Sequence, residues 1–300
     1  MSEHSTNHIL MVEPASFTAN PETMGDNAFQ HHVEGQKDSR PQAMALKEFR
    51  GLQQALEDWG VVVEKYKAYA SDNTPDSIFP NNWFSTHENG RCVLYPMKCP
   101  SRRRERRSDM INDLRHQYDR VIDLTYYEER SLFLESTGSL VLDRLNKVAY
   151  GCVSERTSQV VAEEWAQQMG YSLYLFHACG VSGKPVYHTN VMLSLGDHFA
   201  VVCLDAVDAD EREKLRGALS DARTEVVELS QMQMDCYCAN LLELKGEVDP
   251  VIAMSKNAYH NFRRDQIKVL EKYGQLLVAD VSVIEWFGGG SVRCMIAELF

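Results

Sequence analysis

The sequence predicts a single α/β domain built from a repeated unit of strand, strand, helix and strand. Five helical segments with amphipathic spacing are each followed by a strand-like segment, and their starts lie roughly 50 to 60 residues apart. Pairs of short apolar runs separate several of these helices. Evenly spaced units of this size indicate an internal repeat. Five units in one domain suggest a closed ring in which each unit covers the exposed edge of the next, with a conventional α/β sandwich as the alternative.

In chain order, polar residues 1–8 are expected to form a loose tail, and residues 9–12 a short strand. Residues 14–38 are rich in Asn, Gly, Pro and His and predict a long loop, of a kind that is often functional. Apolar spacing predicts helices over residues 41–59, 103–118, 157–169, 209–221 and 258–273. The strands expected after them cover 61–63, 121–124, 171–176, 225–229 and 276–284. Further strand pairs are expected at 140–144 with 148–153, 191–195 with 199–204, and 241–244 with 251–254.

Composition is that of an ordinary globular protein, with 44% apolar and 25% charged residues among 300. A net charge of −12 argues against general nucleic-acid binding. No apolar run approaches the roughly 20 residues needed to span a membrane, and the N-terminus lacks the pattern of a signal peptide. These features predict a cytoplasmic protein that binds neither nucleic acid nor membranes.

Eight cysteines lie at positions 92, 99, 152, 179, 203, 236, 238 and 294. Several stand inside apolar runs, where cysteine behaves as a small core residue. None forms C-x-x-C, and no Cys/His group has the spacing of a structural zinc site. Free thiols in a reducing compartment are expected, with no metal and no cofactor.

Four segments carry polar residues that core packing does not require. Residues 75–84, with Asp76, Asn81 and Asn82, could line a pocket or form a turn with aromatic anchors. Glu135 follows an apolar run and would need a partner if enclosed, although it could also cap a turn. His188 could transfer protons near neutral pH or be an ordinary core histidine.

The fourth segment is Gly288-Gly289-Gly290-Ser291-Val292-Arg293-Cys294. Three glycines allow a tight turn and a close approach by a ligand, and a cysteine beside a cation is a plausible thiolate nucleophile. The alternative is a glycine loop that precedes a buried cysteine. Thiol, imidazole and carboxylate on separate segments together favour an enzyme.

The ordered motifs PDSIFPNNWFSTH, LESTGSLVLDR, CVSERTS, VYHTNVML and GGGSVRCM resemble the amidinotransferase (pentein) superfamily. The likeness extends from Met11 onward and is greatest to citrulline-utilization hydrolases, or arginine deiminase-related proteins. It implies a five-fold pseudosymmetric α/β propeller of ββαβ units. It also implies a hydrolase of the ureido or guanidino group of an arginine-like amino acid.

The resemblance implies a role for each matching residue. Cys294 would be the nucleophile, His188 the general acid and then base, and Glu135 the carboxylate that orients the histidine or holds a substrate nitrogen. Asp76 would bind the head of the substrate, and Arg102 and Arg144 match arginines that bind its carboxylate. Arg102 also fits a solvated helix start, because it opens the run Arg102-Arg103-Arg104-Glu105-Arg106-Arg107.

One departure concerns the substrate. Relatives that act on charged guanidines carry acids where this sequence has Asn81 and Asn82, and arginine deiminases have an acid at the position of Asn190. A carboxylate pair suits a guanidinium, whereas amides both donate and accept and suit a neutral ureido group. Citrulline is therefore the favoured substrate, which would be converted to ornithine, carbon dioxide and ammonia through a thioester on Cys294.

Several alternatives stay open from sequence. They are an arginine deiminase or dihydrolase, a dimethylarginine hydrolase, an amidinotransferase, and a non-catalytic small-molecule-binding or redox-sensing protein that keeps the fold. The expected partner is a small-molecule substrate of the citrulline or arginine type. The sequence leaves open whether the chain forms a homo-oligomer and whether the 14–38 loop covers the pocket.

Overall fold

The computed structural model describes residues 4–31 and 40–300. Within them the strands form five sheets of three strands each. In every sheet the middle strand pairs antiparallel with one neighbour and parallel with the other. The middle strand and its parallel partner are joined by a helix-containing connection, as a parallel pair requires. This arrangement confirms the predicted α/β class and the five-unit count.

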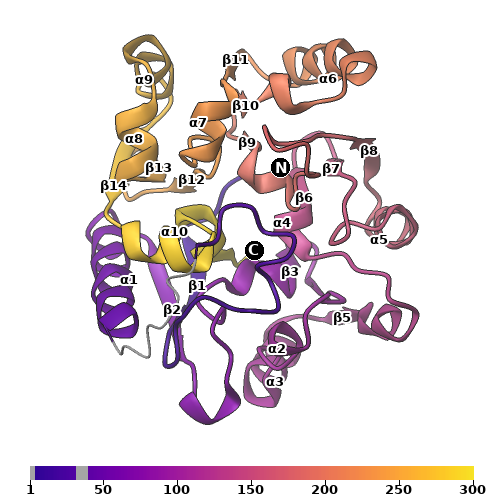
Figure 1. The fold of residues 1–300 in the computed structure, drawn as a ribbon, viewed down its shortest axis with the longest axis vertical. Helices are drawn as coiled ribbons and strands as arrows, with labels where there is room; N and C mark the ends of the chain where they lie inside the picture. Colours follow the sequence, from indigo (N-terminus) through magenta and orange to yellow (C-terminus); the bar gives the residue numbers. More distant parts are fainter. Residues whose placement is uncertain (1–3, 32–39) are drawn as a thin grey trace.

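The sheets follow one another around the molecule (Figure 1). In chain order of their middle strands they contain β15 (Ala297–Glu298), β1 (His8–Glu13) and β2 (Val62–Lys67); β3 (Phe84–His87), β4 (Arg91–Leu94) and β5 (Arg120–Asp123); β6 (Leu140–Asp143), β7 (Val148–Cys152) and β8 (Ser172–Phe176); β9 (Leu193–Leu195), β10 (Phe199–Val202) and β11 (Glu225–Glu228); β12 (Leu242–Lys245), β13 (Pro250–Ser255) and β14 (Gln275–Ala279).

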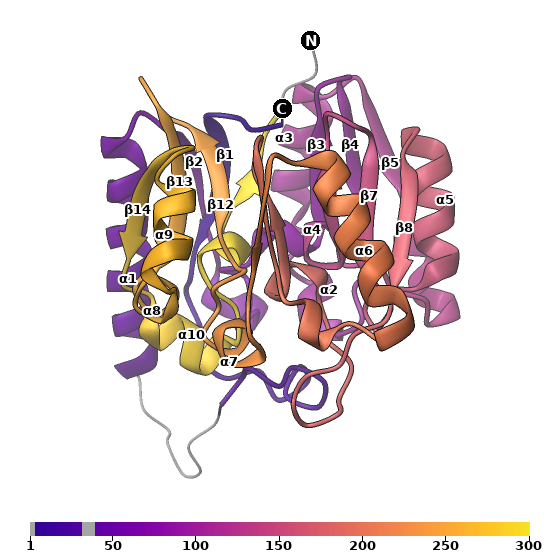
Figure 2. The ribbon, with the colours of Figure 1, turned by 90° about the horizontal axis from the view of Figure 1, so that it is seen from above.

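Long helices lie on the outside of the sheets (Figure 2). The helices are α1 (Arg40–Asp58), α2 (Pro100–Arg103), α3 (Ser108–Gln117), α4 (Ser136–Ser139), α5 (Gln159–Met169), α6 (Ala209–Ala222), α7 (Gln231–Asp235), α8 (Lys256–Asn261), α9 (Arg264–Leu270) and α10 (Ser282–Gly288). Short 3₁₀ turns are η1 (Ala70–Asp72), η2 (Pro80–Asn82), η3 (Thr125–Arg130), η4 (Thr189–Val191), η5 (Leu204–Ala206) and η6 (Val292–Met295).

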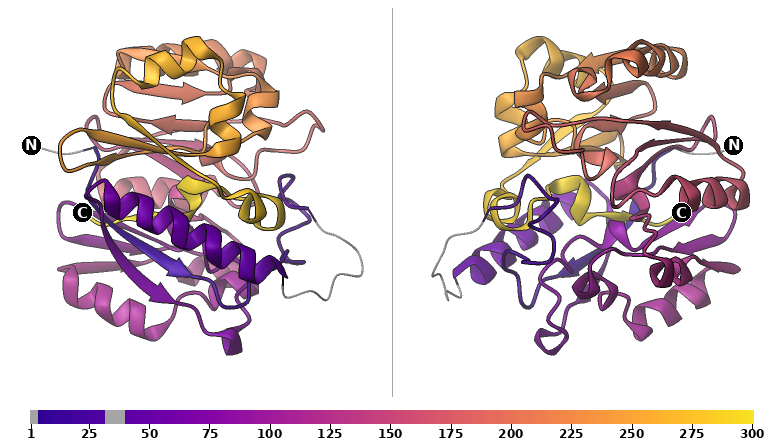
Figure 3. Two further views of the ribbon diagram at one scale, coloured as in Figure 1. Left: turned by 90° about the vertical axis from the view of Figure 1, so that its left-hand side faces the viewer. Right: turned by 45° about the vertical axis from the view of Figure 1, so that its right-hand side comes forward.

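Helix α5 shows how a unit is held together. Val161, Trp165 and Met169 recur at helical spacing, are buried, and join a core cluster with residues of β6 and β7. The helix ends at Gly170, whose φ of 73° is the left-handed conformation that glycine adopts without strain. Helix α1 packs along β1 and β2 in the same manner (Figure 3).

Two sequence predictions near the chain termini are wrong. Residues 4–8 are not a loose tail, because His4, Ser5 and Thr6 are buried and the Thr6 hydroxyl donates to the Leu299 carbonyl at 2.8 Å. Residues 1–3 lie outside the described part of the chain. The strand expected over 276–284 ends at Ala279, and α10 begins at Ser282. The Glu48 carboxylate of α1 accepts the amide N–H groups of Val283 and Ile284 and thereby caps α10.

The helix expected over 258–273 is also divided, into α8 and α9. The Ser255 hydroxyl accepts the Ala258 amide and starts α8, and the Gln266 side chain accepts the Arg263 amide at the start of α9. Residues 14–31 contain neither helix nor strand, as predicted for this part of the 14–38 loop. No described helix has the length and apolarity required to cross a membrane.

Candidate active site

The predicted catalytic residues lie on, or directly before, short turns in different units. A short helical turn leads directly into the first strand of four sheets: η2 into β3, α4 into β6, η4 into β9, and η6 into β15. Asn82 and Cys294 lie within η2 and η6, respectively. Glu135 and His188 directly precede α4 and η4. The turns contact one another at the centre of the molecule. Residues far apart in sequence therefore meet in one buried site.

Cys294 is buried, at 3% exposure, and its sulfur faces amide groups. The Nδ2 groups of Asn190 and Asn240 donate to Sγ at 3.5 and 3.3 Å. N–H donors directed at a sulfur stabilise negative charge on it. Asn240 Oδ1 lies 3.7 Å from the same sulfur and can accept a hydrogen bond from it. Two side-chain amides thus contact the predicted nucleophile.

His188 and Glu135 form a buried pair. His188 Nε2 lies 2.8 Å from Glu135 Oε2. Burial lowers the pKa of His188, while the hydrogen bond and the charge of Glu135 oppose this. With Nε2 held by the carboxylate, Nδ1 is the nitrogen that can exchange protons with a substrate. The pair has the geometry of a proton-transfer group and its orienting acid.

Glu135 is kept ionised by a cation that sequence reasoning did not identify. Arg156 Nη1 lies 3.4 Å from Glu135 Oε2, and the Lys98 backbone amide donates to Oε1 at 3.1 Å. Burial alone would raise the pKa of Glu135, but Arg156 and the bond to His188 outweigh it and lower the pKa well below its usual range. Arg156 is itself paired with Asp26.

Asp76 provides a hydrogen-bond acceptor and Asn82 a hydrogen-bond donor in the same cavity. Asp76 Oδ2 accepts from Asn20 at 2.7 Å, whereas Oδ1 has no hydrogen-bond partner among the described residues. Asn82 Oδ1 accepts from Arg102 Nη1 at 2.8 Å, which fixes the orientation of the amide. Its Nδ2 is left without a partner in the described part of the chain. The cavity thus presents one unused acceptor and one unused donor, both buried.

Arg102 holds this arrangement together. Its guanidinium forms a two-point ion pair with Glu105, at 2.8 and 3.0 Å, and also donates to the Phe79 carbonyl. Burial raises the pKa of Glu105 to about 7 despite Arg102. Burial likewise raises the pKa of Asp76, and Arg102 opposes that shift. Arg102 lines the cavity and donates to Glu105, Asn82 and the Phe79 carbonyl, and its contact with a substrate carboxylate stays a prediction.

Gly138 allows the site to close around these groups. A Cβ at this position would lie 2.4 Å from Asn82 Nδ2 and 2.8 Å from His188 Nδ1. Contacts this short are forbidden, so any larger side chain would displace one of the two groups.

Residues of the 14–31 loop cover the catalytic cavity. This cavity is small and is lined by Thr23, Asn27, Asp76, Phe79, Asn82, Arg102, Arg156, Tyr187, His188, Gly288, Gly289, Gly290 and Cys294. Asn27 Nδ2 donates to the Gly289 carbonyl at 3.2 Å, and the Tyr187 hydroxyl donates to the same oxygen at 2.7 Å. The glycine turn is thus fixed from two sides.

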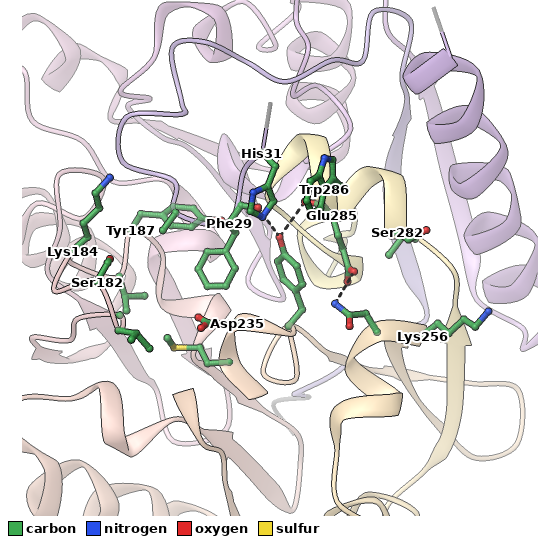
Figure 4. Close-up of a pocket in the computed structure, with 18 of the residues that line it drawn as sticks. Phe29, His31, Ser182, Lys184, Tyr187, Asp235, Lys256, Ser282, Glu285 and Trp286 are labelled. Atoms are coloured by element: carbon green, nitrogen blue, oxygen red, sulfur yellow. Dashed lines mark hydrogen bonds between the residues drawn. The ribbon is translucent and has the colours of Figure 1, made fainter. Parts of the chain in front are cut away.

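A larger groove of about 850 Å³ adjoins this cover (Figure 4). Phe29 and Tyr187 pack edge to face at 6.0 Å, and Tyr187 lines both spaces. Asp235 and Lys184 lie on the groove wall near them. The groove therefore gives solvent access to the outer side of Tyr187.

Two of the predicted substrate-binding residues lie outside the catalytic cavity. Asn81 is buried, and its Nδ2 donates to Thr137 Oγ1 at 3.3 Å. Arg144 follows β6 at the end opposite Glu135, donates to the Thr86 carbonyl and stacks over Phe300. Neither belongs to the described lining of the catalytic cavity. Strand β6 carries Arg144 to the end away from Glu135, and its contact with a substrate carboxylate stays a prediction.

Asn240, Arg156 and Glu105 were not identified from sequence. Asn240 lies two residues before β12, and Asn190 lies three residues before β9, so the two amides have similar places in the fifth and fourth units. This repeated position was the one sequence signal that could have identified Asn240. Arg293, left open from sequence, pairs with Glu298 at 2.7 Å and not with Cys294.

A metal-binding arrangement is found only away from this site. Among residues 4–31 and 40–300, the one group of three or more His, Cys, Asp or Glu close enough to share an ion is His177, Asp208 and Glu211. His177 and Asp208 are exposed, and this cluster follows β8 on the surface.

Comparisons with known proteins agree with this geometry. The model of the family "N,N dimethylarginine dimethylhydrolase, eukaryotic" matches residues 13–300. No curated protein matches the sequence. The apo structure of ArgZ, an arginine dihydrolase from the ornithine-ammonia cycle in cyanobacteria, has a TM-score of 0.76 and 16% identity. That alignment covers 97% of this chain and 40% of ArgZ, so the chain spans less than half of that protein.

The N-terminal domain of ArgZ bound to product aligns with a TM-score of 0.75 and 15% identity, over 97% of this chain and 96% of that one. A mutant dimethylarginine dimethylaminohydrolase (DDAH) from Pseudomonas aeruginosa, complexed with citrulline, aligns with a TM-score of 0.69 and 16% identity. The alignment covers 98% of this chain and 99% of the DDAH chain. At such identities these structures establish a shared fold.

Proposed function

Because the chain belongs to the eukaryotic N,N-dimethylarginine dimethylhydrolase family, it is a hydrolase of non-peptide C–N bonds, and we propose that its substrate is citrulline. The membership confirms the resemblance to the amidinotransferase superfamily. We also propose that the five sheets form a five-fold pseudosymmetric propeller. Contacts of β3 with β15 and of β9 with both β6 and β12 support this arrangement.

The choice of substrate rests on two buried atoms that have no hydrogen-bond partner among the described residues, the acceptor Asp76 Oδ1 and the donor Asn82 Nδ2. A ureido group has one carbonyl acceptor and several N–H donors. Its oxygen can accept from Asn82 Nδ2 while its nitrogens donate to Asp76 Oδ1. A guanidinium has only donors, so it would leave the Asn82 amide unpaired. A buried donor without a partner costs about 1–3 kcal/mol, which favours citrulline over arginine in this cavity.

The proposed reaction has two stages. The Cys294 thiolate adds to the ureido carbon, and the bond from that carbon to the δ-nitrogen breaks as His188 gives its proton to the departing amine. Ornithine leaves, and a carbamoyl group remains on sulfur. Glu135 stabilises the imidazolium that precedes this transfer, while the lowered pKa of His188 eases release of the proton.

In the second stage water adds to the carbamoyl carbon while His188 accepts a proton from it. The C–S bond breaks and the thiolate is restored. The released carbamic acid decomposes to carbon dioxide and ammonia. Asn190 and Asn240 stabilise the thiolate both as nucleophile and as leaving group.

Hydrolysis of dimethylarginine is the second candidate, since it is the activity that the family description names. Product analysis separates the two. Purified protein is incubated with citrulline, arginine or dimethylarginine, and ornithine, citrulline, ammonia and dimethylamine are measured. Ornithine and ammonia from citrulline support the proposal. Dimethylamine release without action on citrulline would replace it with the second candidate, and ornithine from both arginine and citrulline would indicate a dihydrolase.

The variant Asn82→Asp sharpens this test. It supplies a second carboxylate beside Asp76 and removes the donor that the ureido oxygen needs. We expect the ratio of kcat/KM for citrulline to that for arginine to fall by about tenfold to a hundredfold, corresponding to one unsatisfied buried polar group. Asn81→Asp is the matched control, because it adds the same charge one residue away but outside the cavity lining. An equal change of the ratio in both variants would refute the role of Asn82.

A further inference from the structure

A second polar cavity is lined by Asn190, which contacts Cys294, and by Arg293, which precedes Cys294 in the chain. We call it the axial cavity, because first strands or strand-leading turns of four sheets line it. Its lining is His4, Thr137, Val141, Leu142, Arg144, Asn190, Leu193, Ser194, Leu195, Leu241, Leu242, Arg293 and Glu298. About 30 Å³ is open to water-sized molecules. A buried water needs roughly 10–15 Å³ measured in this way, so two waters fit.

Three buried polar atoms on the wall of the axial cavity lack hydrogen-bond partners among the described residues. They are His4 Nδ1, Ser194 Oγ and Asn190 Oδ1, and each side chain is at least nine-tenths buried. Buried polar groups nearly always have partners. Three such atoms around one small polar space are the arrangement that holds ordered water.

The charges around the axial cavity disfavour a cationic occupant. Glu298 pairs with Arg293 at 2.7 Å and lies 4.0 Å from Arg144. Arg144 also donates to the Thr86 carbonyl. One carboxylate between two guanidinium groups leaves the wall with one net positive charge. Water suits such a space, because its oxygen accepts from guanidinium and amide donors.

Asn190 connects the two cavities. Its side chain lines the axial cavity, and its Nδ2 donates to Cys294 Sγ at 3.5 Å. Thr23 and Asn27 of the cover line the catalytic cavity but not the axial cavity. While a carbamoyl group occupies Cys294, a water that donates to Asn190 Oδ1 would lie next to the sulfur without crossing this cover.

We propose that the axial cavity holds the water that hydrolyses the carbamoyl thioester. This inference rests on the proposed function. The water adds to the carbamoyl carbon, gives its proton to His188, and the C–S bond then breaks to release carbamic acid and the thiolate. The space bounded by His4 and Asn190 holds the store of water, and Asn190 directs it toward the thioester.

Two variants at one position test the proposal. Ser194→Leu fills the axial cavity, whereas Ser194→Ala removes the hydroxyl and keeps the space. Citrulline is mixed rapidly with each protein, the first turnover of ornithine gives the rate of acylation, and the steady state gives kcat. Intact mass measures the fraction of protein that carries a carbamoyl group during turnover.

For Ser194→Leu we expect kcat to fall by about tenfold or more, the first ornithine turnover to keep its rate, and the carbamoyl adduct to accumulate. Ser194→Ala should keep kcat within about threefold of wild type without the adduct. Val141→Phe fills the same cavity from β6 and should reproduce the Leu variant, which covers a failure of Ser194→Leu to fold. Equal behaviour of filled and unfilled variants would overturn the proposal.

The outcome for the wild-type protein tests the proposed function separately. If it yields no ornithine from citrulline, the substrate assignment is wrong whatever the variants do. The same measurements on the substrate that is turned over then test the axial cavity, since any such substrate leaves a group on Cys294 that water must remove.

Discussion

Cys294 and Cys152 are both buried cysteines near strand termini, yet the groups around their sulfurs differ in kind. The Cys152 thiol faces carbonyl oxygens, of which that of Val186 is 3.7 Å away, and burial raises its pKa to about 12. The Cys294 sulfur also has an acceptor nearby, Asn240 Oδ1 at 3.7 Å, but in addition the Nδ2 groups of Asn190 and Asn240 donate to it. Acceptors hold a proton on sulfur and donors favour its loss. Among the described residues, two side-chain donors at Cys294 and only acceptors at Cys152 distinguish the two sulfurs.

Replacement of the two cysteines is expected to give the largest contrast. Cys294→Ala should lower kcat/KM by at least about 10³-fold, because no other group forms the thioester. Cys152→Ala should stay within about threefold of wild type. Steady-state kinetics on folded protein, with folding checked by thermal melting, provide the measurement. Similar losses in the two variants would mean that Cys294 is not the nucleophile.

Glu135→Gln should follow with a smaller effect. The variant keeps the shape of the side chain but removes the charge that stabilises the imidazolium of His188. We expect kcat to fall by about 10²–10³-fold, within the usual range for general acid–base catalysis. Arg156 keeps Asp26 as a partner, so the fold should survive. A change confined to KM would instead assign Glu135 to substrate binding.

Asn240→Ala tests the comparison directly, since it removes one of the two donors to Cys294. We expect alkylation of Cys294 by iodoacetamide at neutral pH to slow by about tenfold, the scale of one hydrogen bond to a charged group. Peptide mass spectrometry follows Cys294 and Cys152 in the same sample, and labelling of Cys152 should not change. An unaltered rate at Cys294 would show that Asn240 does not support the thiolate.

The smallest expected effect concerns the buried histidine His87 and the pH dependence of stability. Burial lowers the pKa of His87 well below 6.5, and Arg144 lowers it further. The unfolded chain therefore binds a proton at higher pH than the folded one, so stability is lost as pH falls below about 6.5. One such histidine contributes a slope of up to about 1.4 kcal/mol per pH unit. His87→Gln should flatten the pH dependence of the unfolding free energy below 6.5, and an unchanged slope would contradict this.

Much of the architecture follows from periodicity alone. Amphipathic spacing located α1, α5 and α6 to within a few residues. Amphipathic spacing failed at Leu276–Ile284, where one apolar run contains the end of β14 and the start of α10. The boundary is set by the Glu48 carboxylate of α1, which caps α10, and no residue of the run itself marks it. Apolar runs of this length do not distinguish strand from helix.

Site residues were predictable where a motif places them at the start of a first strand. Cys294, His188, Asp76 and Asn82 all line the catalytic cavity, and Glu135 pairs with His188 behind it. Arg144 lies outside that cavity, because four residues of β6 span about 13 Å and carry the chain to the other end of the sheet. Asn240 and Arg156 carry no local motif, since their roles arise only from contacts between units.

The pairing of β15 with β1 has a consequence for how the protein folds. Leu10 pairs with Ala297, so the first sheet joins segments separated by nearly the whole described chain. Closing so long a loop costs entropy that local contacts do not repay, and contacts of high sequence separation form slowly. Cys294 lies three residues before β15. We therefore expect the nucleophile to enter its site in the last step of refolding, so that activity recovers after the helical signal has already returned.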